Sequence, residues 1–395
     1  MHSANEPGNL AIYASSERTS KGRIYDEPPP VHRNHYQRDR DRIIHSAAFR
    51  RLDYKTQVFV NHEGDLFRTR LTHSLEVSQI ARSIARELKL HEDLAETIAL
   101  SHDLGHAPFG HAGQDALNRS MKNYGGFEHN LQSVRVVDEL EEKYAEFPGL
   151  NLTFESREGI LKHCSVKDAQ NLGELGKRFA LKHQPSLEAQ VCDLADEIAY
   201  NNHDVDDGLR YGLITMKQLL DIQVFREQYE QVHARYPNLG ERRQIHEIIR
   251  RMINRMIVDL IETSKARLSA LNPQNPDDAR HQKTSTICFS DELRKQNLEL
   301  KKFLREQLYK HYRVQRMTKK AEQVLTALFE AFMNDLNILP PEFRQHCDQL
   351  KHQLGDSGTA RGISDYIAGI TDRFAIVEYE RIFNPRQLSF ANLIP

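Results

Sequence analysis

Apolar residues recur at intervals of three and four along most of this chain, and this spacing restricts the possible folds more than any other feature of the sequence. In the segment THSLEVSQIARSIARELKL, one helical stripe consists of Val77, Ile80, Ala81, Ile84 and Leu88. Thr72 stands before that stripe as an N-cap residue, and the segment EDLAETIALSHD repeats the same pattern. The sequence therefore predicts an all-α fold.

The helical pattern is interrupted or absent in three places. Residues 54–70 contain two β-favouring runs around Glu63-Gly64, which predict a small β-hairpin. Residues 1–36 hold few apolar side chains and three consecutive prolines, which predict a flexible N-terminal arm. A polar, proline-rich stretch from 270 to 286 then separates a catalytic core over 37–270 from a C-terminal helical region over 287–395.

Composition narrows the class of protein. The chain has 395 residues, with 54 basic against 56 acidic side chains, so no bulk attraction to nucleic acid or to a membrane surface is expected. Its apolar runs are much shorter than the ~18 residues of a membrane span, and its N-terminus lacks an apolar signal-type stretch. Four widely spaced cysteines argue against disulfides and thiolate zinc sites. We expect a cytoplasmic protein that makes no membrane contact.

One stretch of the C-terminal region is locally basic. Residues 301–320 contain eight lysine and arginine residues, with Phe303, Leu308 and Tyr309 among them. Such a pattern is compatible with binding of a regulatory nucleotide or single-stranded DNA. More often, such a run is the solvated face of an amphipathic helix.

Histidines and carboxylates gather at positions that the helical pattern turns inward. His73 continues the stripe of its own helix, and His102, followed directly by Asp103, extends the next one. Asp196 lies on a semi-apolar helix face one turn before Tyr200, where a carboxylate is costly unless a cation meets it. Two imidazoles and two carboxylates suit a divalent metal such as Mn, Fe, Co or Ni, and Mg on the carboxylate side. Buried core histidines and a capping aspartate are the alternative interpretation.

These four residues match the H…HD…D signature of the HD-domain metal phosphohydrolases. Five blocks resemble the deoxynucleoside triphosphate triphosphohydrolases, or dGTPase-like family: FRRLDYKTQVF, RTRLTHSLEV, HDLGHAPFGHAG, GGFEHN and DLADEIAYNNHDVDDGL. The resemblance covers roughly Gln37 to Leu213, and DYIAGITDRFA near the C-terminus shares it. An HD pair alone is a weak motif, whereas five blocks in order are highly specific. The resemblance implies an HD-domain helical core with His73, His102, Asp103 and Asp196 as metal ligands.

The resemblance also implies a reaction, in which a deoxynucleoside triphosphate and water give a deoxynucleoside and inorganic triphosphate. A metal-bound hydroxide would attack the α-phosphorus, and a general acid would protonate the leaving 5′-oxygen. His111 matches the position of the acid, with His106 binding phosphate or tuning it, and with Glu128 and His129 as a further acid/base pair. Gln114 stands where some relatives carry a carboxylate, so Glu128 is the candidate partner of His111.

Substrate contacts follow from the same resemblance. Arg70 would clamp an α-phosphate oxygen, because a guanidinium binds phosphate bidentately. Gln57 and Asp204 resemble the pair that contacts the sugar 3′-hydroxyl, and Tyr200 would lie under the deoxyribose, where its ring excludes a 2′-hydroxyl. The family further suggests a homo-oligomer.

Two other functions remain open at this point. A different HD-type nucleotide phosphohydrolase (a 5′-nucleotidase, a phosphodiesterase or an alarmone hydrolase) would use the same metal ligands. A non-catalytic nucleotide sensor with a vestigial site would not need to retain all four of them. Release of intact triphosphate would distinguish a deoxynucleoside triphosphate triphosphohydrolase from both of these alternatives.

Overall fold

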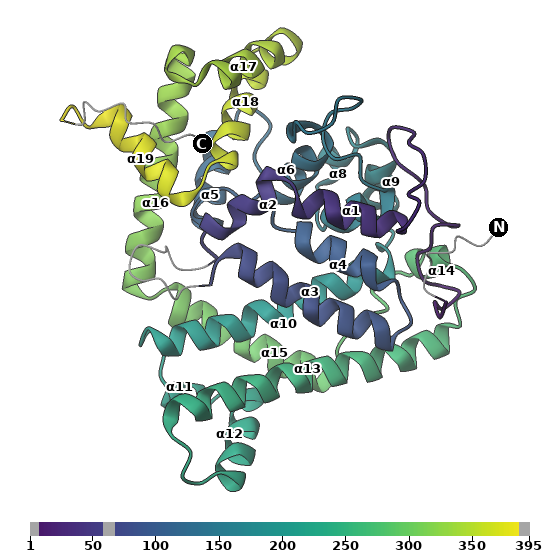
Figure 1. Ribbon diagram of the computed structural model, residues 1–395. Helices are drawn as coiled ribbons and strands as arrows, with labels where there is room; N and C mark the ends of the chain where they lie inside the picture. The colour runs from purple at the N-terminus through teal and green to yellow at the C-terminus, as the bar shows by residue number, and fades with distance from the viewer. Residues whose placement is uncertain (1–7, 58–67, 387–395) are drawn as a thin grey trace. The chain divides into compact units, whose positions relative to one another are not determined.

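The computed structural model describes residues 8–57 and 68–386, and most of these residues are helical (Figure 1). The predicted all-α fold is therefore confirmed. Within the described ranges the only extended pairing is an isolated antiparallel bridge between Thr56 and Thr69. The hairpin predicted around Glu63-Gly64 lies outside the described residues and is not confirmed. None of the described helices combines the length and the apolar character that crossing a membrane requires.

The helices of the N-terminal half are α1 (His35–Ile44), α2 (Ala47–Arg51), η1 (Leu52–Tyr54), α3 (Arg70–Glu87), α4 (Glu92–Ser101), α5 (Gly110–Ser120), α6 (His129–Arg135), η3 (Val136–Leu140), α7 (Phe154–Ile160), α8 (Val166–Ala169), α9 (Gly173–Leu181) and α10 (Leu187–Arg210). Those of the C-terminal half are α11 (Met216–Leu219), α12 (Gln223–Arg235), α13 (Glu241–Leu271), α14 (Pro276–Arg280), α15 (Asp291–Leu304), η4 (Arg305–Tyr309), α16 (Tyr312–Asn334), η5 (Leu336–Ile338), α17 (Pro341–Leu354), α18 (Asp356–Gly369) and α19 (Asp372–Phe383). The short helices η1 and η5 are 3₁₀ in character, and η3 and η4 are π-helical.

The chain forms two compact units, each assembled from separated segments. The first unit comprises the described residues up to Ile43, His73–Ser101 and Asn151–Val314. The second comprises Ile44–Thr72, His102–Leu150 and the described residues from Gln315 onward. The predicted division into an arm, a core and a C-terminal region stays a prediction.

In the first unit, α10 is the central helix and packs against α4, α7, α13 and α15. Its start is set by Ser186, whose side chain accepts a hydrogen bond from the Ala189 N–H. The long helix α13 packs against α10, and α12 packs against α13 (Figure 1). Asn272 ends α13 in the left-handed conformation that favours asparagine or glycine.

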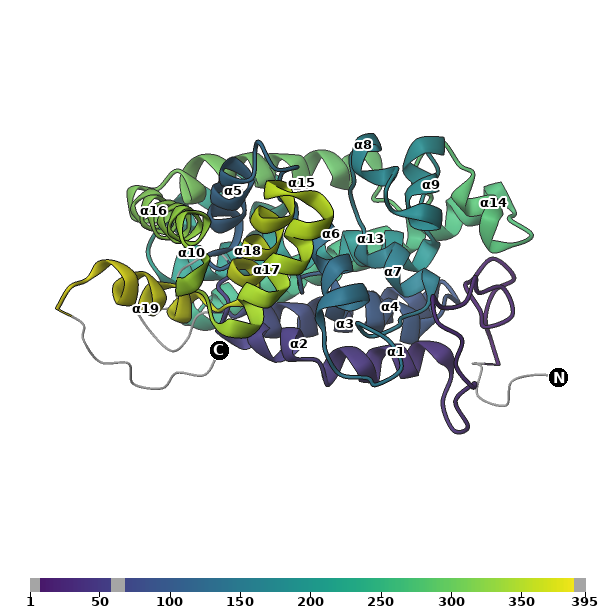
Figure 2. The ribbon, with the colours of Figure 1, turned by 90° about the horizontal axis from the view of Figure 1, so that it is seen from above.

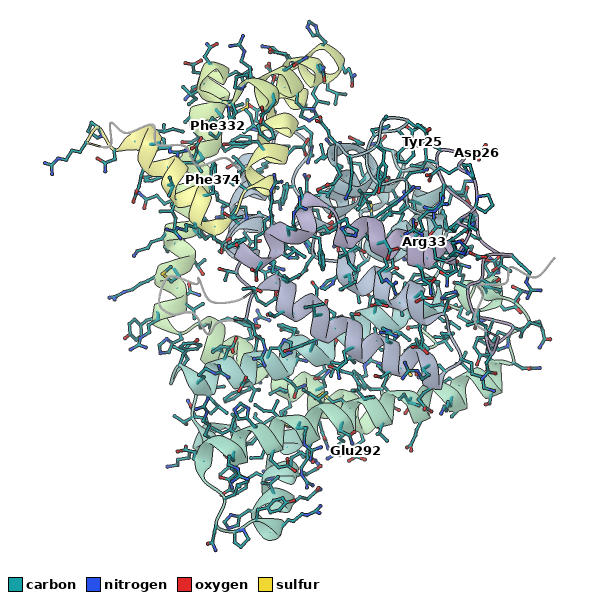
Figure 3. All side chains as sticks on the ribbon, viewed as in Figure 1. Tyr25, Asp26, Arg33, Glu292, Phe332 and Phe374 are labelled. Atoms are coloured by element: carbon teal, nitrogen blue, oxygen red, sulfur yellow. The ribbon has the colours of Figure 1, made fainter. Side chains whose placement is uncertain are left out.

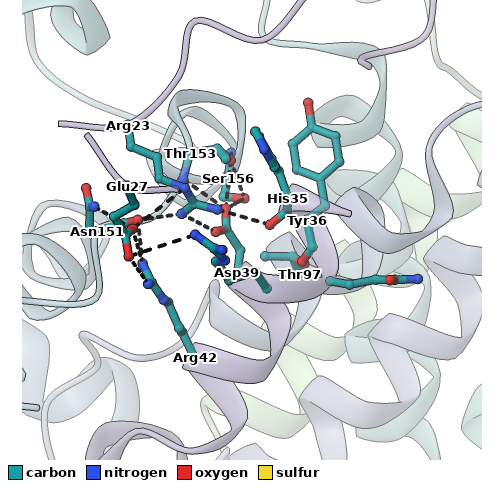
Figure 4. Close-up of polar contacts among 12 residues, drawn as sticks. Arg23, Glu27, His35, Tyr36, Asp39, Arg42, Thr97, Asn151, Thr153 and Ser156 are labelled. Atoms are coloured by element: carbon teal, nitrogen blue, oxygen red, sulfur yellow. Dashed lines mark hydrogen bonds and ion pairs between the residues drawn. The ribbon is translucent and has the colours of Figure 1, made fainter. Parts of the chain in front are cut away.

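Partly buried ion pairs hold the N-terminal segment of the first unit in place (Figure 4). Arg42 Nη1 donates to Glu27 Oε2 at 2.8 Å, and Arg23 Nη1 donates to Asp39 Oδ1 at 2.6 Å. The second oxygen of Asp39 accepts the Thr153 N–H at 2.9 Å. The segment before α1 is thus connected to α1 and to the start of α7. We call Arg23, Glu27, Asp39 and Arg42 the arm cluster.

The second unit has its own apolar core, built mainly from α5, α16, α18 and α19. Phe332 of α16, labelled in Figure 3, packs edge-on against Tyr366 of α18, with ring centroids 5.5 Å apart. Helices α17 and α18 lie side by side in Figures 1 and 2 and contact each other along their length. Cys347 of α17 and Ile363 of α18 are fully buried in this core.

The basic stretch 301–320 covers the end of α15, η4 and the start of α16. Leu304 and Leu308 are buried, whereas Lys302, Arg305 and Lys310 are exposed. This is the pattern of a solvated helix face. Binding of a regulatory nucleotide or single-stranded DNA to the stretch stays a prediction.

Candidate active site

A buried aspartate, Asp103, organises the histidine-rich segment of the second unit. Arg70, the first residue of α3, donates from Nη1 to Asp103 Oδ2 at 2.8 Å. His106 Nδ1 and His102 Nε2 lie 3.1 and 3.3 Å from the other oxygen of Asp103. Burial by itself raises the pKa of this carboxyl, but the positive charge of Arg70, followed by the contacts with the two imidazole rings, holds the pKa well below its usual value. Asp103 is therefore a carboxylate at neutral pH.

The other histidines of the segment lie beside this carboxylate. The ring centroid of His106 is 4.0 Å from that of His129 and 5.9 Å from that of His111. Burial, followed by the positive charge of Arg70, holds the pKa of His106 well below its usual value. Part of the His111 side chain is accessible to solvent. Desolvation by the surrounding protein nevertheless lowers the pKa of His111, and the positive charge of Arg70 lowers it further. In the free protein, both rings are neutral at pH 7.

Glycines shape the turn that carries these histidines. Gly110 has a φ of +58°, and a Cβ there would lie 3.1 Å from Arg70 Nη2 and 3.2 Å from the Gln57 backbone oxygen. At Gly105 a Cβ would lie only 2.2 Å from the backbone nitrogen of Ser133 on α6. The turn can approach Arg70 and α6 this closely because both positions lack a side chain.

Helix α6 presents His129 to the cluster. Glu128 caps this helix by accepting the Leu131 N–H at 3.0 Å, and its Oε1 lies 3.1 Å from His129 Nδ1. Gln114 Oε1 also contacts His129 Nδ1. Glu128, the predicted partner of His111, and Gln114 therefore both contact His129.

In the first unit, His73 and Asp196 form a second polar group. His73 Nε2 lies 3.0 Å from Asp196 Oδ1, and its Nδ1 lies 3.3 Å from His203 Nδ1. Lys162 donates to Asp196 Oδ2 at 2.7 Å. His203 and Lys162 were not among the residues predicted from the sequence. The signal for His203 was its place two turns after Asp196 on α10, whereas Lys162 lies in a loop and carried no signal.

Tyr200 and Asp204, also on α10, meet an aromatic side chain from far along the chain. The hydroxyl of Tyr309 donates to Asp204 Oδ2. Burial, followed by the charge of Asp204, raises the pKa of Tyr309 well above its usual value, so the hydroxyl keeps its proton. Burial also raises the pKa of Tyr200. In the sequence, Tyr309 stood out only as one aromatic residue of the basic stretch 301–320.

Gln57 belongs to the second unit, and its Oε1 is buried without a hydrogen-bond partner among the described residues. Its predicted partner Asp204 belongs to the first unit. His73 and Asp196 likewise belong to the first unit, and the His102-Asp103 pair belongs to the second. That these groups meet on one substrate and one ion stays a prediction.

Comparison with known proteins identifies the class of protein to which this chain belongs. The HD domain family model matches residues 70–201, which contain all four predicted metal ligands. A second model, the phosphohydrolase-associated domain, matches residues 287–381. With the local geometry described above, these matches identify the chain as a phosphohydrolase of the HD-domain class.

More particularly, the chain belongs to the deoxyguanosinetriphosphate triphosphohydrolase-like family. A protein of that name from Bordetella pertussis is 60% identical over 378 residues, which cover 95% of this chain and 96% of the relative. The protein from Nitrosomonas europaea is 59% identical, over 95% of this chain and 98% of the relative. The protein from Thiobacillus denitrificans is 56% identical, over 95% and 97%.

Proposed function

We propose that this protein hydrolyses deoxynucleoside triphosphates to a deoxynucleoside and inorganic triphosphate. The observation that carries the proposal is the buried group of Arg70, His102, Asp103 and His106, which we call the Asp103 cluster. It places a carboxylate, a guanidinium and imidazoles, that of His106 being neutral, within residues 70–201, the HD segment of the chain. The family membership supports the same chemistry. We also propose that the protein acts as a cytoplasmic homo-oligomer.

A divalent metal would be held by His73, His102, Asp103 and Asp196. The donors suit such an ion, because two imidazoles and two carboxylates form a mixed nitrogen and oxygen set that Mn, Co, Fe or Ni binds well, and Mg can use the carboxylates. Asp103 supports this assignment, since its low pKa keeps it anionic in buried surroundings. When bound, the metal would acidify a water molecule and neutralise charge on the α-phosphate.

Arg70 would bind the α-phosphate. One of its N–H groups is already directed by Asp103, whereas its buried Nε has no hydrogen-bond partner among the described residues. A buried guanidinium N–H without a partner costs stability unless a ligand satisfies it. A phosphate oxygen is a suitable acceptor, because the fork of an arginine matches phosphate geometry.

His111 would donate the proton to the leaving 5′-oxygen. Its lowered pKa makes it neutral in the free protein, but a bound triphosphate places negative charge beside it and raises that pKa toward neutrality. His106 would contact phosphate oxygens, and Glu128 with His129 would form an adjoining acid/base pair. In this arrangement, the bound substrate would itself favour the protonated form of His111.

Gln57, Tyr200 and Asp204 would select the sugar. The unpartnered buried Oε1 of Gln57 is an acceptor suited to the 3′-hydroxyl proton. Asp204 would contact the same hydroxyl, with Tyr309 holding its carboxylate in place. Tyr200 would exclude a ribose by the bulk of its ring, because a 2′-hydroxyl needs space that the ring occupies.

The test is a substrate screen with product identification. The four deoxynucleoside triphosphates and their ribose counterparts would each be incubated with the metal-free protein plus Mn, Co or Mg. We expect inorganic triphosphate and deoxynucleoside as the products, with little turnover of the ribose compounds. Release of orthophosphate or pyrophosphate would favour another HD-type nucleotide phosphohydrolase, and the absence of turnover would favour a sensor. Light scattering of the purified protein would test the homo-oligomer.

A further inference from the structure

Two buried ionisable side chains of the second unit have no part in the chemistry proposed above. Lys55 is 2% exposed and Asp372 is 4% exposed. Lys55 lies two residues before Gln57, and Asp372 is the first residue of α19. Ionisable groups are seldom buried so completely unless they make specific hydrogen bonds.

Lys55 connects the histidine-rich turn to the C-terminal helices. Its Nζ donates to the backbone oxygen of His106 at 2.7 Å and to that of Ala368, near the end of α18, at 2.7 Å. Its own backbone oxygen accepts the Arg70 N–H at 3.1 Å. One residue thus joins the segment of Gln57, the start of α3, the turn of His106 and the end of α18.

Asp372 makes the complementary connections. Its Oδ1 accepts the Phe109 N–H at 2.9 Å, and its Oδ2 accepts the Thr56 N–H at 2.9 Å. Thr56 is followed by Gln57, and Phe109 lies two residues before His111. One carboxylate therefore fixes the backbone beside the predicted sugar contact and beside the predicted acid.

The turn needs such fixing because its conformation is unusual. Phe109 has a φ of +65°, a left-handed conformation that is uncommon for an aromatic residue and costs about 1–2 kcal/mol. The hydrogen bond from Asp372 is made by the N–H of this same residue. The strained turn is therefore held at its strained residue.

We propose that Lys55 and Asp372 are positioning residues that together hold the turn of His106 and His111, and the backbone of Gln57, in the arrangement that hydrolysis requires. The proposal rests on the proposed function for the roles of His111 and Gln57. Asp372 lies within the residues matched by the phosphohydrolase-associated domain, so this region would contribute directly to the geometry of the HD segment. We call Lys55 and Asp372 the brace.

The test combines amide hydrogen exchange with kinetics. Asp372→Asn keeps the shape of the side chain but replaces one acceptor by a donor, so at least one of the two amides loses its partner. We expect faster exchange at Phe109 or Thr56, unchanged metal content, and a kcat for dNTP hydrolysis that falls about 10- to 100-fold, the cost of a misplaced reacting group. Lys55→Met should act in the same direction. The double variant should be little worse than Asp372→Asn, because both residues hold the same turn.

Asp39→Asn is the matched control. Asp39 is fully buried in the first unit and its Oδ2 also accepts a backbone N–H, that of Thr153, at 2.9 Å. This variant should lower the melting temperature and leave kcat and exchange at Phe109 unchanged, measured below the unfolding range.

Folded Asp372→Asn protein with wild-type exchange at both amides and wild-type kcat would overturn the brace. If Asp372→Asn does not fold, Lys55→Met carries the same test. Wild-type protein that hydrolyses no dNTP would refute the proposed function alone, because the exchange measurement needs no substrate.

Discussion

The arm cluster of the first unit and the Asp103 cluster of the second are both buried groups of charged side chains, yet they are composed differently. In the arm cluster two guanidiniums face two carboxylates, Arg38 Nη1 lies 3.9 Å from Glu27 Oε1, and Asn151 contributes further hydrogen bonds (Figure 4). In the Asp103 cluster a single carboxylate faces one guanidinium and two imidazoles, and Arg70 Nε has no partner among the described residues.

The difference shows how buried charge can serve structure or chemistry. Buried guanidinium and carboxylate groups that are hydrogen-bonded to one another need no ligand to satisfy them. A cluster with surplus nitrogen donors and a carboxylate kept anionic is suited to bind a cation and phosphate oxygens. The comparison predicts that substitutions in the two clusters separate cleanly into effects on activity and effects on stability.

The largest expected effect is that of His102→Ala in the Asp103 cluster. If His102 holds the proposed metal, this variant should lose bound metal and its kcat should fall by more than about 1,000-fold, because the metal would be needed to acidify the attacking water. Metal analysis and a dNTP hydrolysis assay check this prediction. Wild-type turnover in this variant would refute the metal assignment.

His111→Ala should distinguish the proposed general acid from the proposed metal ligands. We expect bound metal to be retained and kcat to fall by about 100- to 10,000-fold, the usual contribution of a general acid. A substrate with a better leaving group than the sugar 5′-oxygen should recover part of the loss. Unchanged turnover would exclude His111 as the acid.

Arg42→Met tests the arm cluster. Glu27 would keep its partly buried position without its main partner, and we expect a loss of about 1–3 kcal/mol of the free energy of unfolding, between the values for surface pairs and for fully buried pairs. Denaturant unfolding measures this loss, and kcat per folded molecule should not change. A fall in kcat with unchanged stability would mean that the two clusters are not separable.

The smallest expected effect is the acid dependence of the arm cluster. Burial alone would raise the pKa of Glu27, but Arg42, Arg23 and Arg38 lower it below its ordinary value of 4.5. The folded pKa is thus below the unfolded one, so this stabilisation is complete above the unfolded pKa and is lost as pH falls through the folded one. Melting temperatures of wild type and Glu27→Gln at pH 7 and pH 3 should therefore differ more at pH 7. An equal difference at both values would contradict the assignment.

The residues that the sequence offered as candidates, and that the structure places side by side, lie within continuous motifs. His102, Asp103, His106 and His111 occupy a single stretch, in which His102 and His106 contact Asp103 and the ring of His111 lies beside that of His106. Lys162, Tyr309 and Asp372 escaped prediction because each acts through a partner far along the chain. Thr56 and Asp372, for example, are 316 residues apart.

The all-α fold, the helical faces and the residue types available for metal and phosphate binding follow from the sequence alone, because periodicity, capping and donor chemistry are local properties. Tertiary structure decided which groups are neutral, which are anionic and which are held by a distant carboxylate, as Phe109 is by Asp372. These properties depend on burial and on neighbouring charge, which exist only after segments that are distant along the chain have packed together.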